Sequence, residues 1–330
     1  MNTSHHHHIS RRHLLLAGAG MAAATLSPLS HANAWPTQAI RLVVPYPAGG
    51  INDVVARMFA DQMSQSLGQP FVVDNKPGAG ATIGMADLAK SNDQHTFAFA
   101  AISPLTLNPY LMHVAYAPLE DIIPVASVMY APVYLLATTA FKGKSLDDVL
   151  AQAQTPQGIT VATSGYGTLA HIMVEQLARA TGGKFVHVPY KGGSQLITDA
   201  AGAQFDLLLA NPFAPINALI DQGKLRVLAT TGPQRAAGFK NVPTLGERGF
   251  DKANQTSLFG FYAPKSTAPA VIERFHAEVN RLLQNPQMLQ RLRQLDNVPH
   301  ASTQDSFASA VRKDYALNGV VIEQAGIKAE

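Results

Sequence analysis

The chain has 330 residues, of which 47% are hydrophobic and 14% charged, and its formal net charge is +3. This length suits one large or two ordinary domains, and the composition is too apolar for a disordered protein. Lys and Arg are scattered, with no basic run interleaved with aromatic residues, so nucleic-acid binding is not expected. The absence of cysteine excludes disulfides, thiol catalysis and thiolate metal sites.

Residues 1–34 have the pattern of an export signal. Paired arginines at 11 and 12 precede a Leu/Ala/Gly-rich stretch, and Ala32-Asn33-Ala34 forms an A-x-A cleavage site. The paired arginines favour twin-arginine export, and the general secretory route is the alternative. Cleavage would leave a periplasmic chain that begins at Trp35. No other segment is long and apolar enough to span a membrane.

The first part of the mature chain alternates between strand-like and helix-like segments. The continuous apolar run 40–44 predicts a strand buried on both faces. Apolar residues then recur at helical spacing until Gly68, and Asn52 or Asp53 is expected to cap this helix. The next expected elements are a strand over 71–74, a helix near 82–90, a strand over 96–101 and a turn-to-helix passage from residue 103.

The second part repeats this alternation. A helix is expected over 145–154, opened by Ser145 as N-cap with Asp148 three residues on. It is followed by strands at 158–164, 185–190, 205–210 and 225–231, with intervening helices that include 168–181. The last sixty residues are expected to be largely helical, with 269–284 clearly amphipathic.

This alternation predicts an α/β protein with two domains, each a mainly parallel sheet flanked by helices. Residues 35–135 would form the first segment of domain 1, and residues 136–254 would form domain 2. Residues 255–330 would return to domain 1 with the C-terminal helices.

Small-residue turns follow many of the predicted strands. In parallel sheets such turns lie at helix N-termini, where free N–H groups and the helix dipole favour an anion. Apart from Lys191, these turns contain no Lys or Arg. They are therefore expected to bind a carboxylate through main-chain amides and helix dipoles. A geometric need for glycine is the alternative for any single turn. The turns are 47–53, 77–82, 101–106 (with Ser103), 164–168 and 191–195.

The sequence does not match the more specific catalytic and metal-binding motifs. The third glycine of "GAGATIG" is one place late for a dinucleotide fingerprint, and no phosphate-binding P-loop exists. Ser164 lacks the first glycine of a nucleophile elbow, and His171 has no indicated acidic partner. The six histidines of the mature chain do not pair at metal-ligand spacing. The run His5–His8, native or added, falls in the removed signal, so no metal or other cofactor is expected.

Several blocks resemble the Bug-type extracytoplasmic solute receptors of tripartite tricarboxylate transporters. These blocks include "VVPYPAGGINDVVARMFADQM", "NKPGAGATIG", "ATSGYGTLAHIMVEQL" and "HVPYKGGSQLITDAAGAQFDLLL", in order along the whole mature chain. The resemblance implies a periplasmic-binding-protein (Venus flytrap) fold, in which two α/β domains are joined by crossing strands. The domains are expected to close on a small carboxylate held largely by main-chain amides. Hinge motion is then expected on the crossing strands near 130–137 and 253–259.

The resemblance also implies a set of ligand-binding residues. From the first domain these are Tyr46, Ala48, Gly49, Gly50, Asn52, Asp53, Gly78, Ala79, Gly80, Ala81 and Thr82. From the second they are Ser164, Gly165, Gly167, Thr168, His171 and Asn211. For Tyr46, Asp53 and His171, packing or helix capping is the alternative role.

Three positions depart from the family pattern. Ala81 interrupts the usual glycine run, Asn211 stands where Asp is common, and Ala117 replaces an Asp that usually follows an aromatic residue. The ligand is therefore left open among di- and tricarboxylates, acidic amino acids and aromatic acids.

The sequence thus predicts a monomeric periplasmic solute-binding protein without catalytic activity. Its partner would be a membrane permease of the tripartite tricarboxylate type or a sensor protein. The alternatives are an exported α/β hydrolase, and an export chaperone that binds no small ligand.

Overall fold

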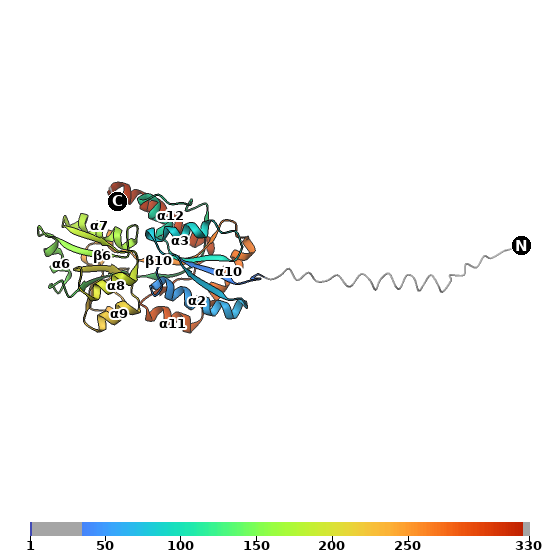
Figure 1. Ribbon diagram of the computed structural model, residues 1–330, viewed down its shortest axis with the longest axis horizontal. Coiled ribbons are helices and arrows are strands. Elements are labelled where there is room, and N and C mark those ends of the chain that lie inside the picture. Colours follow the sequence, from blue (N-terminus) through green and yellow to red (C-terminus); the bar gives the residue numbers. More distant parts are fainter. Residues whose placement is uncertain (2–34, 326–330) are drawn as a thin grey trace. The chain divides into compact units, whose positions relative to one another are not determined.

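The computed structural model describes Met1 and residues 35–325, so the predicted export signal and its cleavage site lie outside the described residues. The described residues from Gln38 onward form one compact unit. Its strands build two sheets, with the orders β11-β4-β10-β3-β1-β2 and β7-β6-β8-β5-β9. Helices flank both sheets, and β10 lies between the two groups of elements (Figure 1).

The first sheet combines the beginning of the mature chain with its end. Its strands are β1 (Ile40–Val44), β2 (Phe71–Asn75), β3 (Thr96–Ala101), β4 (Ile122–Ala131), β10 (Ser257–Pro264) and β11 (Val298–Pro299). Its helices are α2 (Ile51–Leu67), α3 (Thr82–Ala89), α4 (Ser103–Thr106), α5 (Asn108–Leu111), α10 (Pro269–Leu282), α11 (Pro286–Gln294) and α12 (Gln304–Ala325). The largely helical C-terminal part is thus confirmed.

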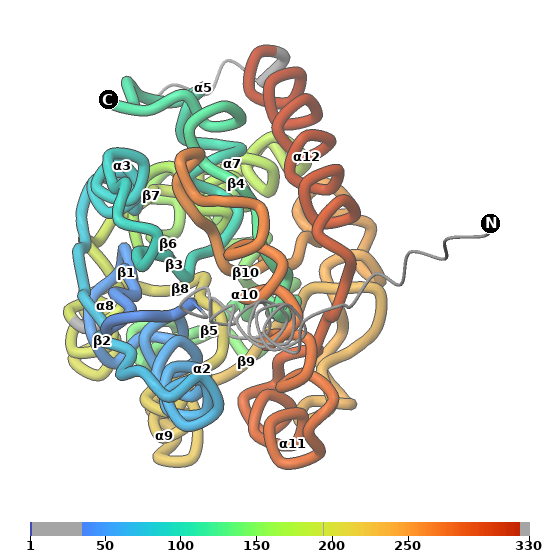
Figure 2. The backbone as a smooth tube through the Cα atoms, turned by 90° about the vertical axis from the view of Figure 1, so that its right-hand side faces the viewer, coloured from blue at the N-terminus to red at the C-terminus, as the bar shows by residue number. Residues whose placement is uncertain are grey.

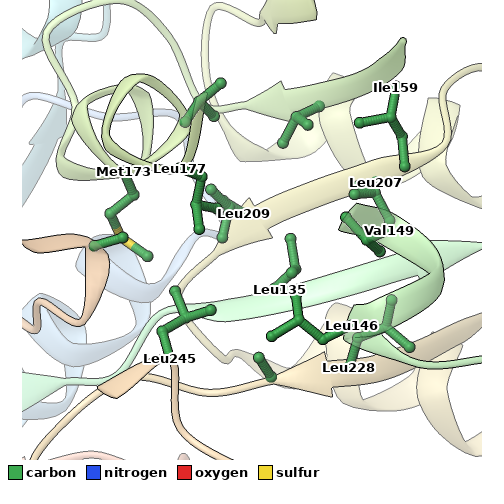
Figure 3. Close-up of a cluster of buried hydrophobic side chains, with 14 of the residues drawn as sticks. Leu135, Leu146, Val149, Ile159, Met173, Leu177, Leu207, Leu209, Leu228 and Leu245 are labelled. Carbon is green, nitrogen blue, oxygen red and sulfur yellow. The ribbon is translucent and has the colours of Figure 1, made fainter. Parts of the chain in front are cut away.

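The second sheet is built from the middle of the chain. Its strands are β5 (Tyr134–Thr138), β6 (Ile159–Thr163), β7 (Phe185–Pro189), β8 (Leu207–Ala210) and β9 (Leu225–Ala229). Its helices are α6 (Leu146–Ala153), α7 (Leu169–Thr181), α8 (Gly193–Ala201) and α9 (Ala214–Asp221). Met173 and Leu177 of α7 face Leu209 of β8 in the core of this half (Figure 3). Burying such side chains stabilises the fold by about 1.5–3 kcal/mol each.

Parallel pairing holds where a helix connects neighbouring strands. β1 runs parallel to β2 and β3, and β6 runs parallel to β7 and β8. The strands near the crossings are antiparallel: β10 to β3 and β4, and β5 to β8 and β9. The two sheets are therefore mixed. Burial patterns do not encode strand direction, because the parallel strand β1 and the antiparallel strands β5 and β10 are all apolar and largely buried.

The chain changes sheet through short connections. β4 ends at Ala131 and β5 begins at Tyr134, so Pro132 and Val133 alone separate the two. β10 returns the chain to the first sheet, with Ser257 paired to Ala131. These are the predicted crossing strands, whereas the exact domain boundaries and the hinge motion stay predictions.

Most predicted helix termini are confirmed, with one correction. Ser145 caps α6 in a reciprocal capping box with Asp148, and Gly68 ends α2 in a left-handed conformation. The prediction that Asn52 or Asp53 caps α2 is wrong, because α2 begins at Ile51 and its N-cap is Gly50. The Asp53 carboxylate instead reaches back from the first turn to the Gly49 N–H, 2.9 Å away.

Among the described helices, none combines the length and apolar character that a membrane span requires.

Candidate functional site

A cavity of about 100 Å³ lies where several strands of both sheets reach their carboxyl ends. Tyr46 follows β1, Ser103 follows β3, Ser164 follows β6 and Asn211 follows β8, and all four line the cavity. A second pocket of about 450 Å³ shares six of its lining residues and extends it outward. Ligands of open α/β sheets bind in this position.

The helices α2, α7 and α8 begin at this cavity. The residues at the start of α2 (Gly50, Ile51, Asn52), of α7 (Thr168, Leu169, Ala170) and of α8 (Gly192, Gly193) line it. The first N–H groups of a helix lack intrahelical partners and carry about half a positive charge together. The cavity therefore has a positive potential that comes from the backbone.

No Lys, Arg, His, Asp or Glu is found among the described residues that line the cavity. Its polar side chains are those of Tyr46, Asn52, Ser103, Ser164, Thr168, Asn211 and Ser257. Large apolar side chains complete the wall, namely Ile51, Val133, Leu169, Leu196, Leu209, Phe213 and Phe259. Such a lining favours a small anion held by N–H and hydroxyl donors rather than by an ion pair.

Of the predicted first-loop residues, Tyr46, Gly50 and Asn52 line the cavity, whereas Ala48, Gly49 and Asp53 do not. The Tyr46 side chain also packs on the core of the first sheet, and its burial raises the pKa of the hydroxyl. The Asn52 Oδ1 is buried without a hydrogen-bond partner among the described residues. Asn52 thus places an unpaired amide oxygen at the wall.

Asp53 shapes the first loop from behind the cavity. Its carboxylate accepts hydrogen bonds from the Gly49 N–H, from Arg57 and from Asn75 over 2.9–3.0 Å. Burial opposes its ionisation, but these hydrogen bonds outweigh burial and lower the pKa of Asp53. Asp53 therefore holds the loop as an anion whose charge is matched by Arg57.

In the second loop, Gly80 lines both pockets, and Gly78, Ala79 and Ala81 line the outer pocket alone. Ala79, Gly80 and Ala81 have positive φ values of 46°, 60° and 79°. The left-handed conformation costs an alanine about 1–2 kcal/mol, so this loop is strained. The hydroxyl of Thr82 donates to the Ala79 carbonyl at 2.8 Å and does not line either pocket.

In the second half, Ser164, Gly167 and Thr168 line the cavity, and Gly165 lines the outer pocket. Thr168 is the N-cap of α7 and accepts the His171 N–H. Asn211 Nδ2 donates to the Pro132 carbonyl at 2.9 Å and to Ser257 Oγ at 3.1 Å. Asn211 thereby links the cavity wall to both chain crossings.

His171 lies behind the cavity wall instead of lining it. Its ring stacks on His187 with centroids 4.5 Å apart, and Tyr166 meets both rings edge-on. His171 Nδ1 accepts the Gly167 N–H, and His187 Nε2 lies 2.7 Å from the Thr163 hydroxyl. Burial lowers the pKa of each histidine to about 4, with the second ring adding to the effect at His187.

This histidine pair predicts a loss of stability in mild acid. Both folded-state pKa values of about 4 lie below the unfolded value of 6.5. The stabilising contribution is therefore complete above pH 6.5 and is lost as the pH falls toward 4. Between pH 7 and pH 5 we expect urea unfolding to show a loss of about 2 kcal/mol for His171. The loss for His187 should be smaller, because its ring is partly exposed and solvent screens its charge. The variant His187→Gln should flatten this slope, and an unchanged slope would contradict the assignment.

Several lining residues had no counterpart among the predicted site residues. Gly192 and Gly193 belong to a turn that the sequence singles out, so their glycines were an available signal. Leu196, Leu209, Phe213 and Phe259 are apolar residues whose sequence pattern is the same as that of core residues. Only the tertiary structure distinguishes them.

In the part of the chain that the structure describes, no group of three or more His, Cys, Asp or Glu side chains is placed to hold a metal ion.

Comparison with known proteins gives a consistent result. The family model described as "Tripartite tricarboxylate transporter family receptor" matches residues 55–327. The chain is 32% identical to the Bordetella pertussis protein BugT over 319 residues, covering 96% of each chain. The solved structure of the periplasmic binding protein BugD is 26% identical with a TM-score of 0.82, covering 90% of this chain and 100% of that one. The R. palustris protein Rpa4515, solved with adipate, is 28% identical with a TM-score of 0.84 and the same coverage.

Proposed function

Since the chain belongs to the receptor family of the tripartite tricarboxylate transporters, we propose that its cavity captures a small carboxylate. One observation carries the proposal: three helix N-termini, from both sheets, converge on a cavity without a charged side chain. Backbone N–H groups can neutralise a carboxylate there without a cation. The similarity to Rpa4515, a protein solved with adipate, supports the same ligand class.

The proposed mechanism is capture by closure. The glycine turns of the first sheet would receive the carboxylate, and the turns before α7 and α8 would cover it. Movement would occur at Pro132–Val133 and before Ser257, where the chain changes sheet. Asn211 contacts both places and the cavity wall, so it would couple ligand contact to the crossings. No bond is made or broken in this function.

The cellular role follows from the family and from the export pattern of the sequence. We propose a mature monomeric protein in the periplasm that delivers its ligand to a permease of the tripartite tricarboxylate type or to a sensor protein. Twin-arginine export is proposed from the paired arginines at 11 and 12.

A thermal-shift screen tests the proposal. The protein would be unfolded and refolded to strip any bound ligand, then mixed with di- and tricarboxylates, acidic amino acids and aromatic acids. A ligand at 100 times its Kd stabilises the native state by about 2.7 kcal/mol, which corresponds to a Tm increase of several degrees. A Tm increase with at least one carboxylate is expected. A flat panel, together with hydrolysis of generic esters, would favour an exported enzyme instead.

A further inference from the structure

Asn108, the first residue of α5, is fully buried between two glycine turns. Its segment connects β3 to β4 and so belongs to the first sheet. Its Nδ2 donates to the Gly80 carbonyl at 2.6 Å. The side-chain amide is therefore held against the second loop of the cavity wall.

The other end of the same amide faces a turn of the second sheet. A Cβ atom on Gly167 would lie 2.2 Å from Asn108 Oδ1, closer than a van der Waals contact allows. A Cβ atom on Gly80 would lie 2.8 Å from both Asn108 Nδ2 and the Tyr166 carbonyl. Two glycine turns, one from each sheet, thus close on one amide, and only glycine leaves room for it.

Asn108 Oδ1 has no hydrogen-bond partner among the described residues. A buried carbonyl without a hydrogen-bond partner costs free energy, so a functional role is one explanation for its presence. The neighbouring Gly167 N–H donates to His171 Nδ1 over 3.4 Å, which is long for a hydrogen bond.

An apolar contact flanks the amide. Leu107 and Leu111 pack with Ile172 of α7 and Ile322 of α12 in a buried cluster. α12 runs past α5, and α7 lies at the same end (Figure 2). Since α7 begins at the cavity, a ligand that holds Thr168 also holds Ile172 against this cluster.

We propose that Asn108 is a positioning residue that latches the two glycine turns together over the bound ligand. This inference rests on the proposed function. The hydrogen bond to Gly80 fixes the Asn108 amide within the first half. The contact with Gly167 joins the two halves, so it forms in the closed state alone. A latch of this kind slows ligand release and leaves ligand entry unchanged.

Stopped-flow kinetics with adipate, or with the carboxylate that gives the largest thermal shift, test the latch. Asn108→Ala should raise koff about tenfold or more, with kon changed less than twofold. Asn280→Ala is the matched control, because its partly buried amide bonds to the Ser302 carbonyl away from both pockets. It should leave both rates unchanged. If Asn108→Ala lowers kon instead, or changes neither rate, the latch is refuted.

Two further measurements keep the test decisive. If Asn108→Ala does not fold, Asn108→Ser replaces it, because a serine hydroxyl is too short to reach both turns. If no carboxylate binds the wild-type protein, the proposed function fails. Amide hydrogen exchange of the ligand-free wild type and variant then tests whether Asn108 holds the two turns together. Faster exchange in both 78–82 and 164–168 of the variant supports the latch, and unchanged exchange overturns it.

Discussion

Gly167→Ala is expected to weaken carboxylate binding by about 100-fold. The added methyl group would overlap the buried Asn108 Oδ1, at 2.2 Å, and overpacking of this kind costs about 1–3 kcal/mol. Separation of the two turns in an open form would relieve this clash, so the variant is expected to fold. Isothermal titration calorimetry with the best carboxylate of the panel measures the loss.

Gly182→Ala is the matched control for this substitution. Gly182 caps the other end of α7 at a φ of 64°, close to the 70° of Gly167, and its Cβ would meet nothing within 4 Å. Both variants therefore carry a similar backbone strain of about 1–2 kcal/mol, but only Gly167→Ala should lose affinity. The double variant Asn108→Ala/Gly167→Ala removes the overlapping atom and should regain part of the affinity. Equal affinity of the two glycine variants would refute the closed contact.

Thr168→Asp is expected to lower affinity by about 100-fold or more, whereas Thr168→Asn should lower it only slightly. Thr168 lines the cavity and caps α7. Asp and Asn are both good N-caps, so the fold is preserved in each variant. They have the same shape, so the difference between them is the negative charge placed beside the bound anion. Calorimetry of both variants at pH 7 measures this difference.

Unfolding of the two Thr168 variants in urea supplies the control. Both should retain the wild-type stability within about 1 kcal/mol. If the Asp variant binds the carboxylate as well as the Asn variant does, the ligand's charge does not lie near Thr168, and the anion site is misplaced.

The fold was largely predictable because local patterns carry it. The apolar runs 40–44 and 96–101 became β1 and β3. Ser145 opens α6 as its N-cap and Gly68 ends α2, as their chemistry requires. The antiparallel strands were not distinguished from parallel ones. β4 and β10 are as apolar as β3, and their direction depends on how the chain crosses between the sheets.

The candidate site was predictable where glycine marks it. Gly50, Gly80 and Gly167 line the cavity as expected, because a turn that approaches a ligand needs a residue without a side chain. Gly49 and Asp53 share the same motif but support the loop from behind. The motif predicts where the loop lies. Which of its residues line the cavity and which support the loop depends on tertiary packing, which the motif does not specify. The apolar wall formed by Phe213 and Phe259 had no local signal at all.

The most direct measurement compares a carboxylate with its uncharged amide on the ligand-stripped protein. Adipate and adipamide have the same carbon skeleton and differ at the groups that the helix N-termini would bind. Calorimetry should give saturable binding for the carboxylate, or for another acid of the panel, and none for the matching amide. Equal binding of both members of a pair would contradict an anion site built from backbone N–H groups, and so would the absence of binding by every acid.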